Sequence, residues 1–233
     1  MLINLDVPKS TETNFLRFWQ QVAKVLGHDE HAVLEHLIDA GTTRGWFPSC
    51  SQLVDRFEET LGRSDAQQAV DRLIQFRLID AGPDGRILST IGGITSGRTR
   101  FAAKADSGTF FLRSAIDCLT IAPTLQKPVT ITTTCGHMGA PIQLVFAADG
   151  SLLDSTPRTV TAFLPGWDGR SPLADAIVTK SHFFANGDAL SDWQMQAGDP
   201  DGMPLTEDTF RFIGVEMAAA IAALYVSFSV REL

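Results

Sequence analysis

The chain has 233 residues, 44% of them hydrophobic, and a formal net charge of −8. A chain of this length and composition can bury a substantial core, as one large domain or two small ones. The excess of acidic residues argues against nucleic acid or an anionic membrane surface as a binding partner.

The cysteines and the ends of the chain bear on its location. Cys50, Cys118 and Cys135 are an odd number of cysteines at distant positions, which suits a reducing cytoplasm better than a disulfide framework. The opening residues, MLINLDVPKS, lack a basic segment followed by an apolar one, so we expect no signal peptide. The long apolar run near the C-terminus contains Arg211 and Glu216 and is amphipathic. We therefore expect a cytoplasmic protein without a membrane partner, of unknown oligomeric state.

The first third of the chain has helical periodicity. Apolar residues recur every three or four positions in residues 11–26, 31–40, 49–61 and 64–78. Glycines follow the first two segments, and a serine opens each of the last two, as expected for helix ends and N-caps. Residues 78–88 then place two short apolar arms around Gly-Pro-Asp-Gly, which predicts a hairpin.

Helices followed by a hairpin are typical of a winged helix, a fold that often binds DNA. Phosphate binding needs a basic face. Residues 51–80, however, contain six acidic and four basic side chains. We therefore expect no nucleic-acid partner, and a structural role for this part of the chain.

A change of pattern divides the chain. Residues 91–100, IGGITSGRTR, are rich in Gly, Ser and Thr, which predicts a boundary between a winged-helix-like helical domain over residues 1–95 and a second domain over 96–233. After Ile121 the apolar period changes from 3.6 to 2, which favours an α+β domain with helices and a small mixed or antiparallel sheet.

The stretch from residue 109 to residue 146 contains the most reactive groups. Its first part, 109–121, has apolar residues at helical spacing and predicts a helix. On that helix Ser114, Asp117 and Cys118 would share one face, because they stand at i, i+3 and i+4.

Further strands are predicted beyond this helix. Residues 129–134 and 142–146 predict a hairpin whose first arm ends at Cys135, and 160–164 predict another strand. Residues 165–175 are turn-forming and could lie over a site.

A family resemblance rests on the order of these features. The chain has, in order, Thr-Phe-Phe, the helix with Asp117, a β run ending in Cys135, Gly-Ala-Pro and a second strand, and then His182-Phe-Phe-Ala followed by Trp193. This ordered set resembles the alkylmercury (organomercurial) lyases. The resemblance covers about residues 106–210. It implies an alkylmercury-lyase-like fold in the second domain and a small-molecule substrate.

The chemistry that this resemblance implies uses two cysteines and an aspartate. Thiolates hold the soft mercury ion, and the carboxylate manages the proton delivered to the departing carbon. Asp117 matches the aspartate, but Ser114 stands where the family has its first thiol. The second thiol would fall within residues 176–181, AIVTKS, which contain no cysteine. Cys135 matches a further family cysteine that looks structural.

Three hypotheses follow. In the first, Asp117, with Ser114 and Cys118 nearby, performs acid/base chemistry on a small organic substrate in place of efficient carbon–mercury protonolysis. In the second, the protein is a genuine organomercurial lyase whose thiol has moved to Cys118. In the third, it is a non-catalytic protein that binds a small molecule or a metal. His182, Phe183 and Trp193 are candidate substrate-binding residues in each case.

Each candidate also has a simpler interpretation. Asp117 could be a surface acid, and Cys118 a small buried apolar residue. Ser114 as a nucleophile would need an adjacent base, and no histidine lies near it in sequence. His182 could be a packing residue. No spacing typical of a zinc, dinucleotide or nucleotide site is present, so we expect no resident metal or cofactor.

Overall fold

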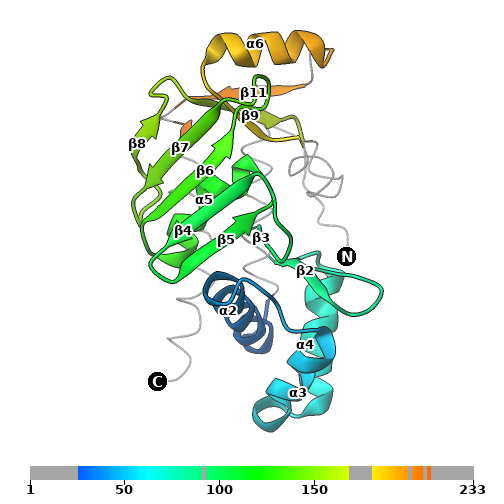
Figure 1. Cartoon of the computed structure of the whole chain (residues 1–233). Coiled ribbons are helices and arrows are strands. Elements are labelled where there is room, and N and C mark those ends of the chain that lie inside the picture. Colours follow the sequence, from blue (N-terminus) through cyan, green and yellow to red (C-terminus); the bar gives the residue numbers. More distant parts are fainter. Residues whose placement is uncertain (1–25, 91–92, 168–179, 199–200, 207–208, 211–233) are drawn as a thin grey trace.

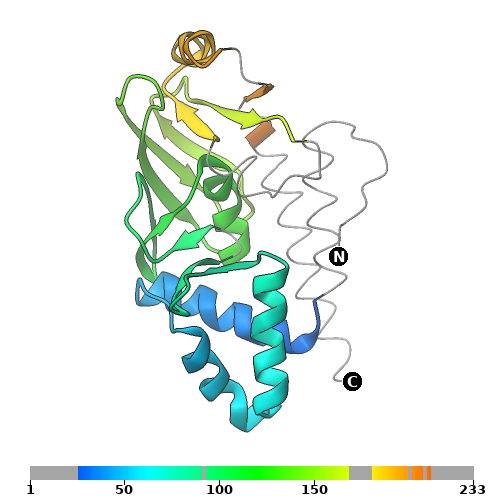
Figure 2. The same ribbon diagram turned by 90° about the vertical axis from the view of Figure 1, so that its right-hand side faces the viewer.

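The computed structural model describes residues 26–90, 93–167, 180–198, 201–206 and 209–210 (Figure 1). Helices α2–α4 lie at one end of the molecule, and a three-stranded sheet with helix α6 lies at the other. A large sheet lies between them, as the turned view also shows (Figure 2). None of the helices within these residues is long and apolar enough to cross a membrane.

Three of the four helices predicted in the first third of the chain are confirmed. They are α2 (His28–Thr43), α3 (Cys50–Leu61) and α4 (Arg63–Gln75). Ser49 caps α3 as expected, because its hydroxyl accepts from the Gln52 backbone N–H while the Gln52 side chain accepts from the Ser49 N–H. The helix predicted over 11–26 lies outside the described residues, apart from Leu26.

The predicted hairpin after α4 is also confirmed. Strands β1 (Ile79–Ala81) and β2 (Ile87–Thr90) pair antiparallel, and Asp80 lies opposite Ser89. Three helices and a hairpin thus follow one another in the predicted order, whereas the winged-helix assignment itself stays a prediction.

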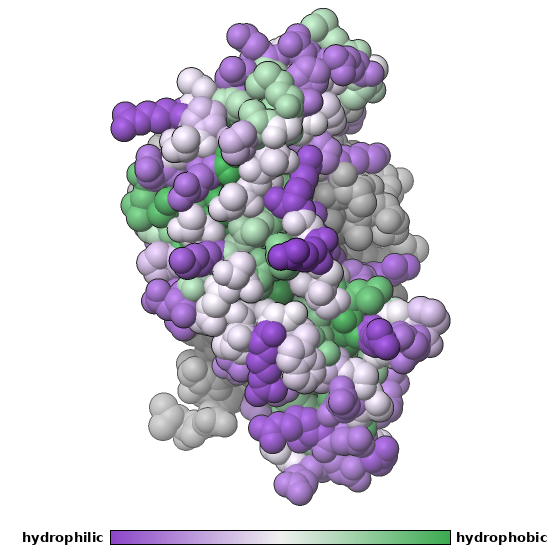
Figure 3. Space-filling model, in the orientation of Figure 1, coloured by the Kyte–Doolittle hydropathy of each residue, from purple (hydrophilic) through white to green (hydrophobic). Residues whose placement is uncertain are grey.

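On the surface of α3 and α4, Arg63 pairs with Asp55 and Glu58. Hydrophilic residues gather at this end of the molecule (Figure 3). The absence of a nucleic-acid partner also stays a prediction.

The large sheet has eight strands in the order β1-β2-β3-β5-β4-β6-β7-β8, and every pairing is antiparallel. Its other strands are β3 (Ile94–Thr95), β4 (Phe101–Ala105), β5 (Gly108–Leu112), β6 (Val129–Thr134), β7 (Pro141–Phe146) and β8 (Leu152–Thr156). The α+β class and the β6–β7 hairpin are confirmed. The sheet is larger than expected because β1–β3 extend it. Since β3 pairs with both β2 and β5, the sheet continues across residue 95, and the two-domain division stays a prediction.

The helix predicted over 109–121 is wrong in its first part. Residues 109–112 belong to strand β5, and helix α5 (Ala115–Leu125) begins only after Ser114. Phe110 and Leu112 alternate with less buried neighbours and pair with β4, so the sheet outweighs the helical spacing of the apolar residues. At its other end α5 continues through Pro123 to Leu125. A proline in the last turn of a helix removes one backbone hydrogen bond, because it has no N–H group to donate.

A second, smaller sheet closes the far end. It has the order β10 (His182–Phe184), β9 (Thr161–Pro165) and β11 (Gly202–Leu205), and helix α6 (Gly187–Gln196) packs against β9 and β10. The strand predicted over 160–164 is therefore confirmed as β9. Most of the predicted loop 165–175 lies outside the described residues. The expectation that this loop lies over a site therefore stays a prediction.

Helix α5 lies at the centre of this arrangement. It packs against β4 and β6 of the large sheet and against β10 of the small one, and residues 115–124 are all buried. A helix buried on every side offers no water to its polar side chains, so each must find a partner within the protein. The start of α5 is therefore where buried polar chemistry is concentrated.

Contacts of α2 with the large sheet should carry much of the stability of the helical end. Leu37 of α2 is fully buried, and α2 packs against β3 and β5. We expect Leu37→Ala to lower the free energy of unfolding by about 2–5 kcal/mol, because it leaves a cavity. Urea denaturation measures this. Leu153→Ala, at a position 63% exposed on β8, is the control and should change it by less than about 0.5 kcal/mol. Equal effects of the two substitutions would contradict this account.

Candidate active site

The first turn of α5 holds a buried serine–aspartate pair. Ser114 is the N-cap, with extended backbone, and its hydroxyl accepts from the Asp117 backbone N–H at 3.3 Å. The same hydroxyl donates to Asp117 Oδ2 at 2.6 Å. Serine is a preferred N-cap and a carboxylate is favoured in the first turn, so the local sequence alone supports this arrangement. The predicted proximity of Ser114 and Asp117 is confirmed.

A glycine forms the wall against the carboxyl group. Gly93 has a positive φ of 74°, and a Cβ atom there would lie 2.0 Å from Asp117 Cγ. Its carbonyl accepts from the Arg113 N–H at 2.9 Å, and its own N–H donates to the Thr90 carbonyl at 3.0 Å. The turn between β2 and β3 can therefore approach Asp117 this closely only with glycine at position 93.

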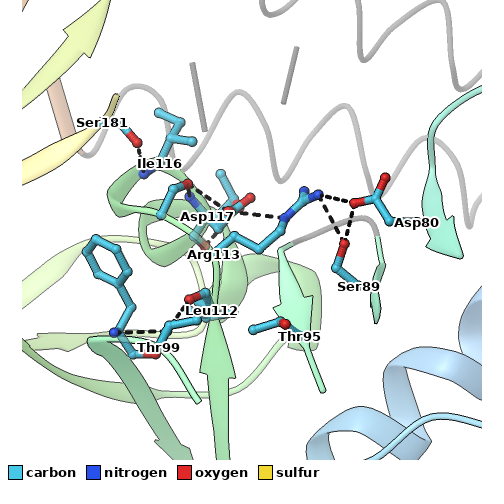
Figure 4. A network of polar contacts seen from close by, with 12 residues as sticks. Asp80, Ser89, Thr95, Thr99, Leu112, Arg113, Ile116, Asp117 and Ser181 are labelled. Carbon is cyan, nitrogen blue, oxygen red and sulfur yellow. Dashed lines mark hydrogen bonds and ion pairs between the residues drawn. The ribbon is translucent and has the colours of Figure 1, made fainter. Parts of the chain in front are cut away.

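Arg113 joins the pair to the β1–β2 hairpin (Figure 4). Its Nε lies 3.7 Å from Asp117 Oδ2. Its Nη1 donates to Asp80 Oδ2 at 3.1 Å and to Ser89 Oγ at 3.3 Å, and Ser89 in turn donates to Asp80. The guanidinium thus lies between two carboxylates, one buried and one partly exposed.

Burial decides the proton affinity of Asp117, whose residue exposure is 7%. Loss of hydration raises the pKa of the Asp117 carboxyl above its ordinary value, while Arg113 and the hydrogen bonds from Ser114 only partly oppose that rise. Ser114 and Arg113 both contact Oδ2. A carboxyl of this kind is suited to give or take a proton.

Cys118 lies in a different environment, although it follows Asp117 directly. Its side chain is fully buried, and within the described part of the chain no hydrogen bond joins its thiol to Ser114 or Asp117. Burial, and then the neighbouring Asp117 charge, raise the pKa of the Cys118 thiol well above its ordinary value. The thiol is therefore neutral, as in a small apolar core residue.

The candidate substrate-binding residues form a second cluster. His182 contacts the Arg100 guanidinium through Nδ1, and its ring lies 5.7 Å from that of Trp193. Burial, assisted by Arg100, lowers the pKa of His182 to about 4, so its imidazole is neutral. Phe183 is fully buried and packs on Phe101, which indicates a core position.

This cluster lies beside α5, which packs against β10, and next to the cluster the Ser181 hydroxyl accepts from the Ile116 N–H at 3.4 Å. In the described ranges no hydrogen bond or ion pair connects His182 or Trp193 to Asp117. Substrate binding by His182, Phe183 and Trp193 stays a prediction.

No metal centre is evident in the described part of the chain, where no three His, Cys, Asp or Glu side chains are grouped to hold an ion. All three cysteines are free. Cys135 is buried at the end of β6, and its sulfur accepts from the Met138 N–H at 3.5 Å, which fits a structural role.

Arg113, Asp80, Ser89 and Gly93 are neighbours of the site that the sequence did not reveal. Asp80 and Ser89 lie opposite each other on β1 and β2, but the predicted hairpin, residues 78–88, contained only Asp80 and had no assigned register. Gly93 belongs to a Gly-Gly pair that we interpreted only as a boundary.

Comparisons with known proteins agree with this fold. The crystal structure of the mercury-bound form of MerB2 matches with a TM-score of 0.73 and 20% identity, over 90% of this chain and 99% of that one. An alkylmercury lyase from Streptomyces lividans is 28% identical over 109 residues, which are 47% of this chain and 49% of that protein. The chain thus spans about half the length of this curated relative.

The family model described as MerB, alkylmercury lyase, matches residues 94–219. This range includes β3 to β11, the buried serine–aspartate pair and the His182 cluster. Because the match covers more than half of the 233 residues, the chain belongs to the alkylmercury lyase family.

Proposed function

We propose that this protein is a divergent enzyme of its family, in which Asp117 performs acid/base chemistry on a small organic substrate and cleavage of carbon–mercury bonds is absent or much weakened. The observation that supports this most is the Asp117 carboxyl itself. It is buried, its pKa is raised, and its Oδ2 accepts a hydrogen bond from the Ser114 hydroxyl. A cytoplasmic location, favoured by three free cysteines, is part of the same proposal.

The neighbours of Asp117 support both halves of a proton transfer. The raised pKa keeps the carboxyl protonated closer to neutral pH, so that it can give its proton to a substrate atom. The carboxylate left behind would be stabilised by the Ser114 hydroxyl and by the Arg113 charge. A proton from solvent or from product would then restore the acid.

The residue at position 114 argues against efficient mercury chemistry. The relatives are named for alkylmercury cleavage and for a mercury-bound form. Mercury prefers thiolates, and an unperturbed thiol with pKa about 8.5 is a few per cent ionised at neutral pH. The Ser114 hydroxyl is a hard ligand, stays protonated, and already donates to Asp117.

The two alternatives receive less support. A lyase with its thiol moved to Cys118 would need that thiol to ionise and meet substrate, yet it is fully buried with its pKa raised. A non-catalytic binding protein would keep the fold without turnover. We keep this alternative as a possible outcome of the experiments below.

The first prediction concerns mercury. With methylmercury or phenylmercury and excess small thiol, we expect the native protein to show little or no release of hydrocarbon. Ser114→Cys should raise the rate by about tenfold or more, because it supplies a thiolate beside Asp117. Gas chromatography of the released methane or benzene measures both. Robust native turnover that is lost on Cys118→Ala would support the moved thiol instead.

The second prediction concerns proton transfer at carbon. Small carbonyl compounds and carboxylic acids can be incubated with the native protein in D2O, and loss of C–H signals followed by NMR. We expect protein-dependent exchange for at least one compound, and Asp117→Asn should lower it by about 10²–10⁴-fold. Cys118→Ala is the control and should retain exchange. Binding of a compound without any exchange would favour the non-catalytic alternative.

The third prediction concerns stability and pH. Because burial raises the pKa of Asp117 above its unfolded value, the neutral carboxyl favours the folded state at low pH, and this contribution is lost as pH rises through the folded pKa. Asp117→Asn stays neutral throughout. We therefore expect the variant to gain stability relative to the native protein as pH rises from about 4, the ordinary pKa of an aspartate, through the folded pKa, as measured by urea unfolding. Asp84→Asn, at an exposed position, should show no such trend, and a flat difference for Asp117→Asn would count against a raised pKa.

A further inference from the structure

Arg113 is held in place by the β1–β2 hairpin and not by Asp117. Within the described residues its guanidinium donates two hydrogen bonds, both from Nη1, to Asp80 and Ser89. Its Nε, the atom nearest to Asp117, is buried, and in the described part of the chain it has no hydrogen-bond partner. The distance of 3.7 Å from Nε to Asp117 Oδ2 is long for a hydrogen bond. The contact with Asp117 is therefore a charge interaction only.

The hairpin presents a matched pair of acceptors. Asp80 and Ser89 are direct partners in the antiparallel register, so their side chains lie next to each other on one face. Ser89 donates to the same Asp80 oxygen that receives Arg113 Nη1, which fixes the orientation of that carboxylate. The Arg113 side chain is 22% exposed and that of Asp80 is 35% exposed. Their pairing is thus partly shielded from water.

From this geometry we infer that Asp80, assisted by Ser89, is a positioning residue for the site. It holds the Arg113 guanidinium out of hydrogen-bonding contact with Asp117, so that the Asp117 carboxyl stays free to exchange a proton with a substrate. The inference rests on the proposed role of Asp117. It assigns a part in the site to a hairpin that lies before the region matched by the family model.

The physical reason is competition for one cation. An arginine that donated two parallel hydrogen bonds to Asp117 would favour the ionised carboxylate strongly. With Nη1 committed to Asp80, the guanidinium cannot turn toward Asp117, and its charge is shared between two carboxylates. Arg113 then moderates the effect of burial on Asp117 without cancelling it.

Other charged groups near α5 do not explain the effect. Arg113 is the charged side chain that acts on Asp117 among the described residues. On the packing elements, Lys104 of β4 is exposed and lies on the face of the strand away from the buried residues. His182 of β10 contacts Arg100, and β6 carries no charged residue. Cys118, which follows Asp117, is neutral.

The test is an NMR titration of the Asp117 side-chain carboxyl carbon in the full chain labelled with ¹³C-aspartate, with the signal assigned by its loss in Asp117→Asn. We expect Asp80→Asn to move the midpoint to lower pH, because Arg113 is released toward Asp117 and its charge is no longer shared. Asp84→Asn removes the same charge from the same hairpin, where Asp84 pairs with Arg86, and should leave the midpoint unchanged.

A double-mutant cycle separates positioning from a direct charge effect. Arg113→Met should move the midpoint to higher pH, and in that background Asp80→Asn should lose its effect. If the effect persists there, Asp80 acts through space and the inference is overturned. A midpoint that stays in place or rises in Asp80→Asn also overturns it. Ser89→Ala changes no charge and should move the Asp117 midpoint to lower pH by a smaller amount than Asp80→Asn. This variant replaces Asp80→Asn in the test if Asp80→Asn does not fold.

The titration needs no substrate, so it can fail independently of the proposed function. If Asp80→Asn shifts the midpoint but no compound shows exchange that depends on Asp117, the positioning holds and the proposed chemistry fails. If exchange depends on Asp117 but the midpoint does not respond to Asp80, the chemistry holds and the positioning fails.

Discussion

The hydrogen bond of 2.6 Å from the Ser114 hydroxyl to Asp117 Oδ2 is the interaction on which the candidate site at the start of α5 depends. It satisfies a carboxyl that burial would otherwise make costly, and it uses the hydroxyl in doing so. A thiol at position 114 would be a weaker hydrogen-bond donor, so the serine exchanges a mercury ligand for a better-fixed acid.

Local sequence predicted the part of the site that depends on local geometry. The spacing of Ser114 and Asp117 was enough to bring them together, whether Ser114 lay inside the helix or, as in the structure, at its N-cap. For Cys118 the same spacing gives less, because spacing along a helix says nothing about which neighbours bury each side chain. A role for its thiol in the site stays a prediction.

The remainder of the site depends on the order of strands, which no local pattern encodes. Arg113 follows β5, and it can reach Asp80 and Ser89 only because β3 alone separates β5 from β2 in the sheet. β3 has two residues, too few for a periodic signal, and the Gly-rich segment that contains it favoured a domain boundary. The sheet thus joins the hairpin to the site across the very segment that composition marks as a break.

This continuity gives the helical end of the molecule a physical connection to the chemistry. Helix α2 packs on β3 and β5, and β1 follows directly from α4. The position of the hairpin, and with it the Asp80 carboxylate, therefore depends on how the helices pack. A change in that packing would reach Asp117 through a single guanidinium, whose charge acts on whichever carboxylate lies nearer. Through Arg113, the proton affinity of Asp117 becomes a property of the whole sheet as well as of the first turn of α5.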